Sequence, residues 1–137
     1  MYNIDEIMDM LDWNNPISVQ AKGCELAGSI KCINVFLQPG HPGHGKNVWE
    51  NCAKILSKKS DAELSPYLME LFDWVKDLNW PGAVRIFERL LKYEPNSSFV
   101  LTLDDSINIA KATNENIWLN NLTEIKDNII ENNTTEN

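Results

Sequence analysis

The stretch "DLNWPGAVRIFERLL", Asp77–Leu91, decides the fold that the sequence predicts. A polar turn is followed by Trp80 and Pro81, and then by apolar residues at the spacing of one helix face. Proline is well suited to the first position of a helix, because its missing N–H would have no partner there. We therefore predict a helix that starts at Pro81 and buries one apolar face, made of Ala83, Val84, Phe87, Leu90 and Leu91.

The same frame occurs 65 residues earlier, in "DWNNPISVQAKGCEL", Asp12–Leu26. Each half of the chain then contains a helix, a turn with Asp and Asn, and a helix started by proline, which is typical of a helical-hairpin repeat. Trp80 stands just before its helix, where we expect it to pack at the hairpin corner. The shift superimposes four residues, Asp12, Asn14, Pro16 and Val19, on Asp77, Asn79, Pro81 and Val84.

Helix-capping residues mark further helix starts along the chain. Asn3 is placed to cap a first helix, and Asn47 is placed to cap the helix of "VWENCAKILSKK". Ser60 and Glu63 have the spacing of a capping box. They predict the start of a long amphipathic helix that ends near Leu78, with Pro66, in its first turns, as the alternative start.

The whole pattern predicts one all-α domain. Two more helices are expected at about 97–113 and 115–130, and the Gly- and Pro-rich segment 38–46 should be a surface loop. We predict a HEAT-like array of antiparallel helical hairpins with about six to seven helices. This helical-repeat domain should span residues 1–131, and residues 132–137 should form a disordered tail.

Composition and charge restrict the class of partner. The chain has 137 residues, of which 43% are hydrophobic, enough for one core. With 20 acidic against 12 basic residues, its formal charge of −8 argues against binding to nucleic acid or to an anionic membrane. No apolar run approaches the ~18 residues of a membrane helix, and the acidic start lacks a signal-peptide pattern. The three cysteines do not form a disulfide framework. We expect a cytoplasmic protein with a basic protein partner.

Three patterns resemble chemical sites, and none of them predicts one. His41 and His44 have the spacing of a metal-binding pair that Cys32 or Cys52 could complete, yet no second close cysteine pair accompanies them. Segment 45–47 lacks the hydroxyl residue that ends a phosphate-binding loop. Cys52 with either histidine could form a hydrolase pair, but Cys52 lies on the apolar side of its helix and is better interpreted as a core thiol. We expect no catalytic, cofactor or metal site.

The acidic residues of the long predicted helix share one face. Wound at about 100° per residue, its carboxylates fall within about 80° of each other, and two aromatic residues separate them from the buried side. A similar stripe of Asp5, Asp9 and Asp12 lies on the first helix. Such a face is either simply solvated or able to bind Arg and Lys side chains through charge-assisted hydrogen bonds and ring contacts. On the second interpretation the partner-binding residues are Glu63, Tyr67, Glu70, Asp73, Trp74 and Asp77.

A resemblance covers nearly the whole chain, from about Ile4 to Leu122. The segments "LFDWVKDLNWPGA", "FLQP" and "KNVWENCAKIL" resemble a family of small bacterial proteins of unknown function, HEAT-like in character, some of which are thought to be immunity proteins of toxin systems. The most specific part is a W-x-x-D-x-N-W-P-G motif, here Trp74, Asp77, Asn79, Trp80, Pro81 and Gly82. The resemblance implies no catalytic residues.

Together these observations predict a non-catalytic protein-binding module. The first hypothesis is an immunity protein that neutralises a basic bacterial toxin domain. Opposite charges increase the association rate of an acidic inhibitor with a basic enzyme, which suits this role. The alternative is a helical-repeat scaffold or adaptor that binds a cellular protein or peptide. A small hydrolase is the third and least favoured hypothesis.

Overall fold

The computed structural model describes residues 2–39 and 45–135, and these residues form helices and turns without a strand. The prediction of an all-α protein is confirmed. The longer helices are α1 (Ile4–Met10), α2 (Ile17–Ala27), α3 (Trp49–Ser57), α5 (Leu68–Trp74), α6 (Ala83–Leu91), α7 (Ser97–Ala112) and α8 (Asn116–Thr135). Shorter elements are the single turn α4 (Asp61–Leu64) and three 3-10 turns, Asn34–Phe36, Lys46–Val48 and Ser65–Tyr67. No helix in the described ranges has the length and apolarity needed to cross a membrane.

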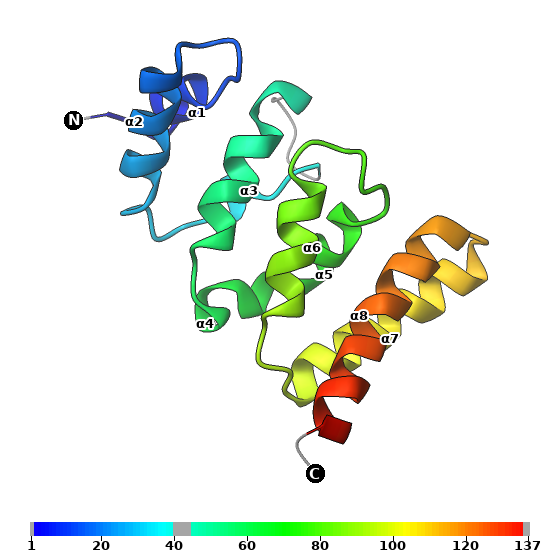
Figure 1. Ribbon diagram of the computed structural model, residues 1–137. Helices are drawn as coiled ribbons and strands as arrows, with labels where there is room; N and C mark the ends of the chain where they lie inside the picture. Colours follow the sequence, from blue (N-terminus) through cyan, green and yellow to red (C-terminus); the bar gives the residue numbers. More distant parts are fainter. Residues whose placement is uncertain (1, 40–44, 136–137) are drawn as a thin grey trace.

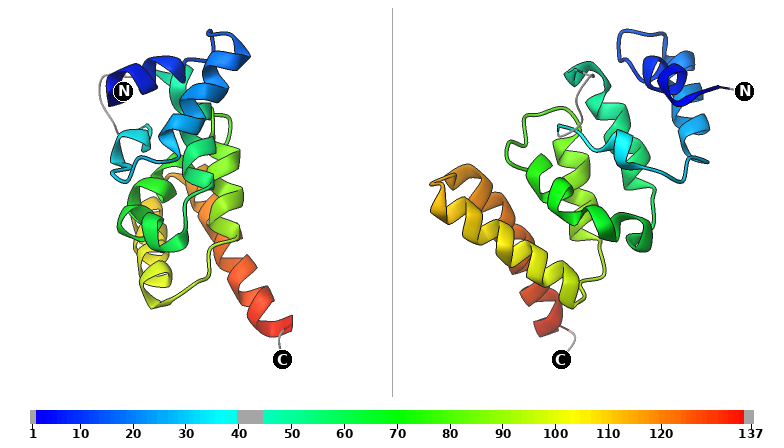
Figure 2. Two further views of the ribbon diagram at one scale, coloured as in Figure 1. Left: turned by 90° about the vertical axis from the view of Figure 1, so that its left-hand side faces the viewer. Right: turned by 180° about the vertical axis from the view of Figure 1, so that it is seen from behind.

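The helices form antiparallel hairpins that stack in chain order (Figure 1). One layer contains α2, α3, α6 and α8, each packed on the one before it. The other contains α1, α5 and α7, which pair with α2, α6 and α8, and Figure 2 shows the two layers from the side. Helix α3 has no full helix as its hairpin partner among the described residues. The short 3-10 turn at Asn34–Phe36, which precedes α3 in the chain, packs on it instead. The predicted array of helical hairpins is therefore confirmed.

A single hydrophobic core extends from Ile7 in α1 to Ile125 in α8. One aromatic cluster of the core lies where α5 meets α7, with the rings of Phe72 and Phe99 5.4 Å apart and those of Tyr93 and Phe99 4.7 Å apart. Offset and edge-to-face contacts of this kind add to the free energy gained by burial.

Polar side chains of later helices bind the carbonyl groups at the ends of earlier ones. The last carbonyls of a helix have no partner within it, so donors from outside stabilise the helix end. Three such donors act on C-cap residues: Asn51 Nδ2 on Leu11 O at 2.8 Å, Lys59 Nζ on Gly28 O at 3.1 Å, and Asn121 Nδ2 on Val75 O at 2.8 Å. These bonds fix how one hairpin sits against the next.

The caps predicted at Asn3 and Ser60 are confirmed, whereas the cap predicted at Asn47 is wrong, because Val48 is the N-cap of α3 and makes no side-chain cap hydrogen bond. The Asn3 side chain accepts the N–H of Glu6, and the Ser60–Glu63 capping box is complete. Helix α3 starts at Trp49 rather than directly after Asn47, because a 3-10 turn comes first.

The helix predicted at Pro81 begins two residues later. Gly82 is its N-cap in a left-handed conformation. The buried face also differs from the predicted one, because Val84 is 49% exposed and Ile86 is buried.

The long helix predicted from Ser60 to Leu78 is wrong, and the alternative start at Pro66 lies closer to α5, which begins at Leu68. Pro66 lies in the 3-10 turn that separates α4 from α5, and α5 ends at Trp74. Proline removes a backbone donor, and its ring clashes with the carbonyl four residues before it, so a regular α-helix does not continue through it. Positions before and after Pro66 therefore do not share one helical wheel.

The tail prediction is also corrected. Residues 132–135 belong to α8 rather than to a disordered segment, and residues 136–137 lie outside the described residues. Asn and Thr are weak helix formers, but extending a helix that already exists costs far less than starting one.

Candidate functional site

The W-x-x-D-x-N-W-P-G motif builds the corner between α5 and α6. The Trp74 indole is fully buried and its N–H donates to the carbonyl of Pro81 at 3.1 Å, across the turn. The Asp77 carboxylate accepts the N–H of Asn79 at 2.8 Å. Trp80, half-buried, meets the ring of Trp49 from α3 edge-on at 5.9 Å. The motif thus positions helices, as expected for Trp80.

Gly82 closes this corner and is required there for two reasons. Its φ of +80° is a conformation that residues with a side chain rarely adopt. A Cβ at this position would lie 2.7 Å from Ala53 Cβ and 2.8 Å from the carbonyl oxygen of Trp49. Helices α3 and α6 therefore approach each other at a distance that only glycine permits.

The corner repeats in the N-terminal half, as the 65-residue shift predicts. The Asp12 carboxylate accepts the N–H of Asn14 at 2.9 Å. The N–H of Asn15 donates to Asp12 O at 3.0 Å, as that of Trp80 donates to Asp77 O at 3.0 Å. Both turns thus have the same side-chain and backbone hydrogen bonds.

The structure divides the predicted partner-binding residues into three groups. The prediction of Trp74 as a contact residue is wrong, because its side chain is fully buried. Asp77 holds the corner turn, and Glu63 belongs to the capping box on the other side of Pro66. Tyr67, half-buried against the core, lies just before α5, whereas Glu70 and Asp73 lie on it.

Glu70 and Asp73 lie near a third carboxylate that the sequence did not suggest. Glu115, at the turn between α7 and α8, acts electrostatically on Asp73 together with Glu70. Partial burial raises the pKa of Asp73, and both carboxylates raise it further, although Lys76 opposes them. Glu70, Asp73 and Glu115 are called the acidic surface below.

Apolar and aromatic side chains border the acidic surface. Met69 is 44% exposed and Ile117 is 70% exposed. The Lys76 ammonium lies 4.5 Å from the centre of the Trp118 ring, and both residues line a hollow of about 460 Å³ next to Glu115. This surface therefore offers negative charge beside exposed apolar area.

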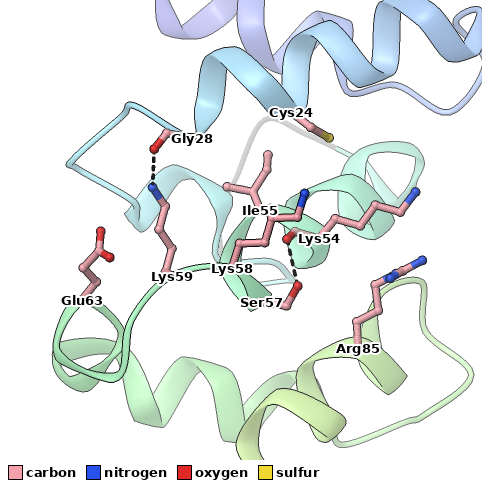
Figure 3. A pocket seen from close by; sticks show the side chains of 9 residues that line it. All are labelled: Cys24, Gly28, Lys54, Ile55, Ser57, Lys58, Lys59, Glu63 and Arg85. Atoms are coloured by element: carbon pink, nitrogen blue, oxygen red, sulfur yellow. Dashed lines mark hydrogen bonds between the residues drawn. The ribbon is translucent and has the colours of Figure 1, made fainter. Parts of the chain in front are cut away.

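A second candidate site has the opposite charge. A cavity of about 370 Å³, called the cationic cavity, lies where α2, the end of α3 and the start of α6 come together. Figure 3 shows that Lys54 and Lys58 extend from α3 on the side of Cys24, and that Arg85 reaches the same region from α6. The full lining is Cys24, Gly28, Lys54, Ile55, Ser57, Lys58, Lys59, Glu63 and Arg85.

The cationic side chains that line this cavity differ in whether a hydrogen bond or an ion pair offsets their charge. The Lys59 ammonium is buried and donates to the carbonyls of Gly28 and Ile30. Arg85 forms an ion pair with Glu50. Within residues 2–39 and 45–135, neither Lys54 nor Lys58 has an ion-pair partner. Sequence reasoning missed this site because its charges come from helices whose packing the sequence does not reveal.

The candidate chemical residues have clear positions where they are described. Cys52 is fully buried, and this burial raises its pKa to about 12, so the thiol is protonated at neutral pH. The interpretation of Cys52 as a core residue is confirmed. His41 and His44 lie outside the described residues. Among the described residues, no three His, Cys, Asp or Glu side chains are grouped so as to hold a metal ion.

Comparison with known proteins identifies a family. A family model described as a domain of unknown function (DUF5071) matches residues 48–135, more than half of the chain, so the chain belongs to this family. The match includes the corner motif and the acidic surface and begins just before α3. No curated protein and no solved structure matches the chain.

Proposed function

We propose that this member of the DUF5071 family is a non-catalytic protein-binding module that receives a basic protein on its acidic surface. Within that role, we propose an immunity protein that acts in the bacterial cytoplasm and neutralises a toxin domain. The observation that carries the proposal is Asp73, a half-buried carboxylate whose raised pKa reflects partial burial and two nearby carboxylates. An arriving Lys or Arg would relieve this unfavourable environment.

The surroundings of Asp73 suit a protein rather than a simple ion. Exposed Met69 and Ile117 provide apolar contact area next to the carboxylates. Interfaces draw most of their affinity from such central apolar contacts, while surrounding charges increase the rate of encounter. The formal charge of −8 adds a long-range attraction toward a basic partner.

The direct test is protection against a toxin domain encoded next to the gene for this chain. That domain is expressed in a bacterial host with and without this protein, and growth is compared. The proposal expects growth to be restored and the two purified proteins to elute as one complex from a sizing column. Growth arrest unchanged by the protein, with separate elution, would contradict the immunity role. Capture of a cellular protein or peptide on the same surface would favour the scaffold or adaptor alternative.

A further inference from the structure

We propose that the cationic cavity is a binding site for a phosphorylated small molecule. This goes beyond the protein-binding role, because the cavity involves α2, α3 and α6, whereas the acidic surface lies on α5 and the turn before α8. The two proposals can fail independently of each other.

The spacing of the cations favours an anion with more than one charge. Lys54 lies in the last turn of α3 and Lys58 is its C-cap four residues later, so the two side chains leave the same side of the helix end. In Figure 3 both side chains lie between α2 and the Arg85 side chain of α6. A lysine ammonium binds phosphate as a point charge, and a guanidinium can bind it through two parallel hydrogen bonds.

The charge balance points the same way. Four cations line the cavity, and Glu63 is the one carboxylate among its described lining residues. The Arg85 charge is offset by Glu50 and the Lys59 ammonium is held by two carbonyls, which leaves Lys54 and Lys58 to be neutralised. A phosphate monoester, with a charge of about −1.5 to −2 at neutral pH, matches these two ammonium groups.

The volume indicates that the ligand carries an organic part. About 370 Å³ lies within the range of small-molecule pockets and exceeds what a phosphate group alone would fill. Ile55 and the half-buried Cys24 form an apolar portion of the wall. A phosphorylated compound can therefore place its phosphate between the two lysines and its organic body against Ile55 and Cys24.

The test is an NMR titration of the full chain with three probes: ribose 5-phosphate, inorganic pyrophosphate and malonate. The proposal expects both phosphates to shift the amide signals of residues 54–59 saturably below roughly 10 mM, with malonate binding more weakly. The variant K54Q/K58Q should bind both phosphates with an affinity lower by roughly tenfold or more. The matched control K22Q/K111Q removes two exposed lysines elsewhere and should change affinity less than about twofold. Circular dichroism and thermal melting confirm that both variants fold.

Three results would overturn the proposal. One is the absence of saturable shifts with either phosphate at that concentration. Another is equal weakening by the control variant, because general attraction would then explain the binding. The last is tighter binding of malonate than of the phosphates, which would identify the cavity as a site for carboxylates.

Discussion

The turn at Asp12–Pro16 and the turn at Asp77–Pro81 share their hydrogen bonds and differ in what fills them. Polar groups hold the first: the Gln20 side-chain amide donates to Asn15 O at 2.7 Å, and Trp13 remains 48% exposed. The second turn is filled by the indole rings of Trp49, Trp74 and Trp80 and by Gly82.

The difference originates in α3, which lies between the two corners. Its Asn51 faces the first turn and donates to Leu11 O, whereas Trp49 and Ala53 face the second. An Asp-x-Asn pattern therefore determines the backbone of a turn locally. Whether the turn is polar or apolar inside depends on which face of a distant helix covers it.

The largest expected effect distinguishes the two corners at Gly82. Replacing Gly82 with Ala should destabilise the fold by about 3 kcal/mol or more, because the left-handed backbone is strained and the added Cβ meets backbone atoms. The position equivalent to Gly82 in the repeat is Ile17, which is 84% exposed. Ile17→Ala should change the free energy of unfolding by less than about 0.5 kcal/mol. Urea unfolding of both variants measures this contrast, and similar losses would show that the corners do not differ in packing.

The next largest effect is the difference in stability between replacing Trp80 and replacing Trp13. Trp80→Ala should cost about 2–3 kcal/mol, below the range for a fully buried indole, because the ring is only partly covered by Trp49. Trp13→Ala, in the exposed turn, should cost less than about 1 kcal/mol. Thermal melting checks both, and a near-neutral Trp80→Ala would reassign that residue to a contact surface.

A smaller effect should be confined to the polar corner. Asn51→Ala leaves Leu11 O without its side-chain donor and should cost about 1–3 kcal/mol. Hydrogen exchange should then accelerate in α1 and α2 more than in α5 and α6, because the hydrogen bonds of the Asn51 side chain join it to Leu11 O after α1 and to Gln20 and Cys24 of α2. Uniform acceleration through all the helices would indicate instead that the two corners unfold as one unit.

The smallest effect concerns acid stability. The backbone N–H of Asn14 lowers the pKa of Asp12 in the folded state. A lowered pKa contributes stability that is present above the unfolded value of about 3.9 and is lost as pH falls through the folded value. Asp12→Asn should therefore be less stable than wild type at neutral pH, with the difference shrinking below about pH 4. A difference that is constant with pH would show that the Asp12 charge does not contribute.

The residues that the sequence predicts correctly act locally. Asn3, Ser60 and Glu63 cap the helices that follow them, and Asp12 and Asp77 form equivalent turns, because each interaction lies within a few residues of the chain. Helix-period spacing likewise locates α7 and most of α8.

The features that the sequence does not predict depend on distant segments or on one interruption. Pro66 breaks the expected acidic helix, so Glu63 and Glu70 no longer share a face. Trp74 is buried in the core against Trp49, and Pro81 O accepts its N–H across the turn. Glu115 reaches the acidic surface only because α5 packs on α7. The periodicity of apolar residues along a helix does not predict any of these contacts.

The central claim, that the acidic surface binds a basic protein, is tested most directly by titrating three proteins against the cognate toxin domain at low and moderate salt. These are the wild type, E70Q/D73N/E115Q, and the control E6Q/E25Q/D105N, which removes three exposed carboxylates elsewhere. Asp77 is left unchanged because it holds the corner turn.

The account predicts that E70Q/D73N/E115Q alone associates more slowly and shows a shallower salt dependence, while all three proteins keep the same helical spectrum. Equal affinities and equal salt dependence for the two triple variants would contradict it, because the acidic surface would then contribute no more than any other three carboxylates.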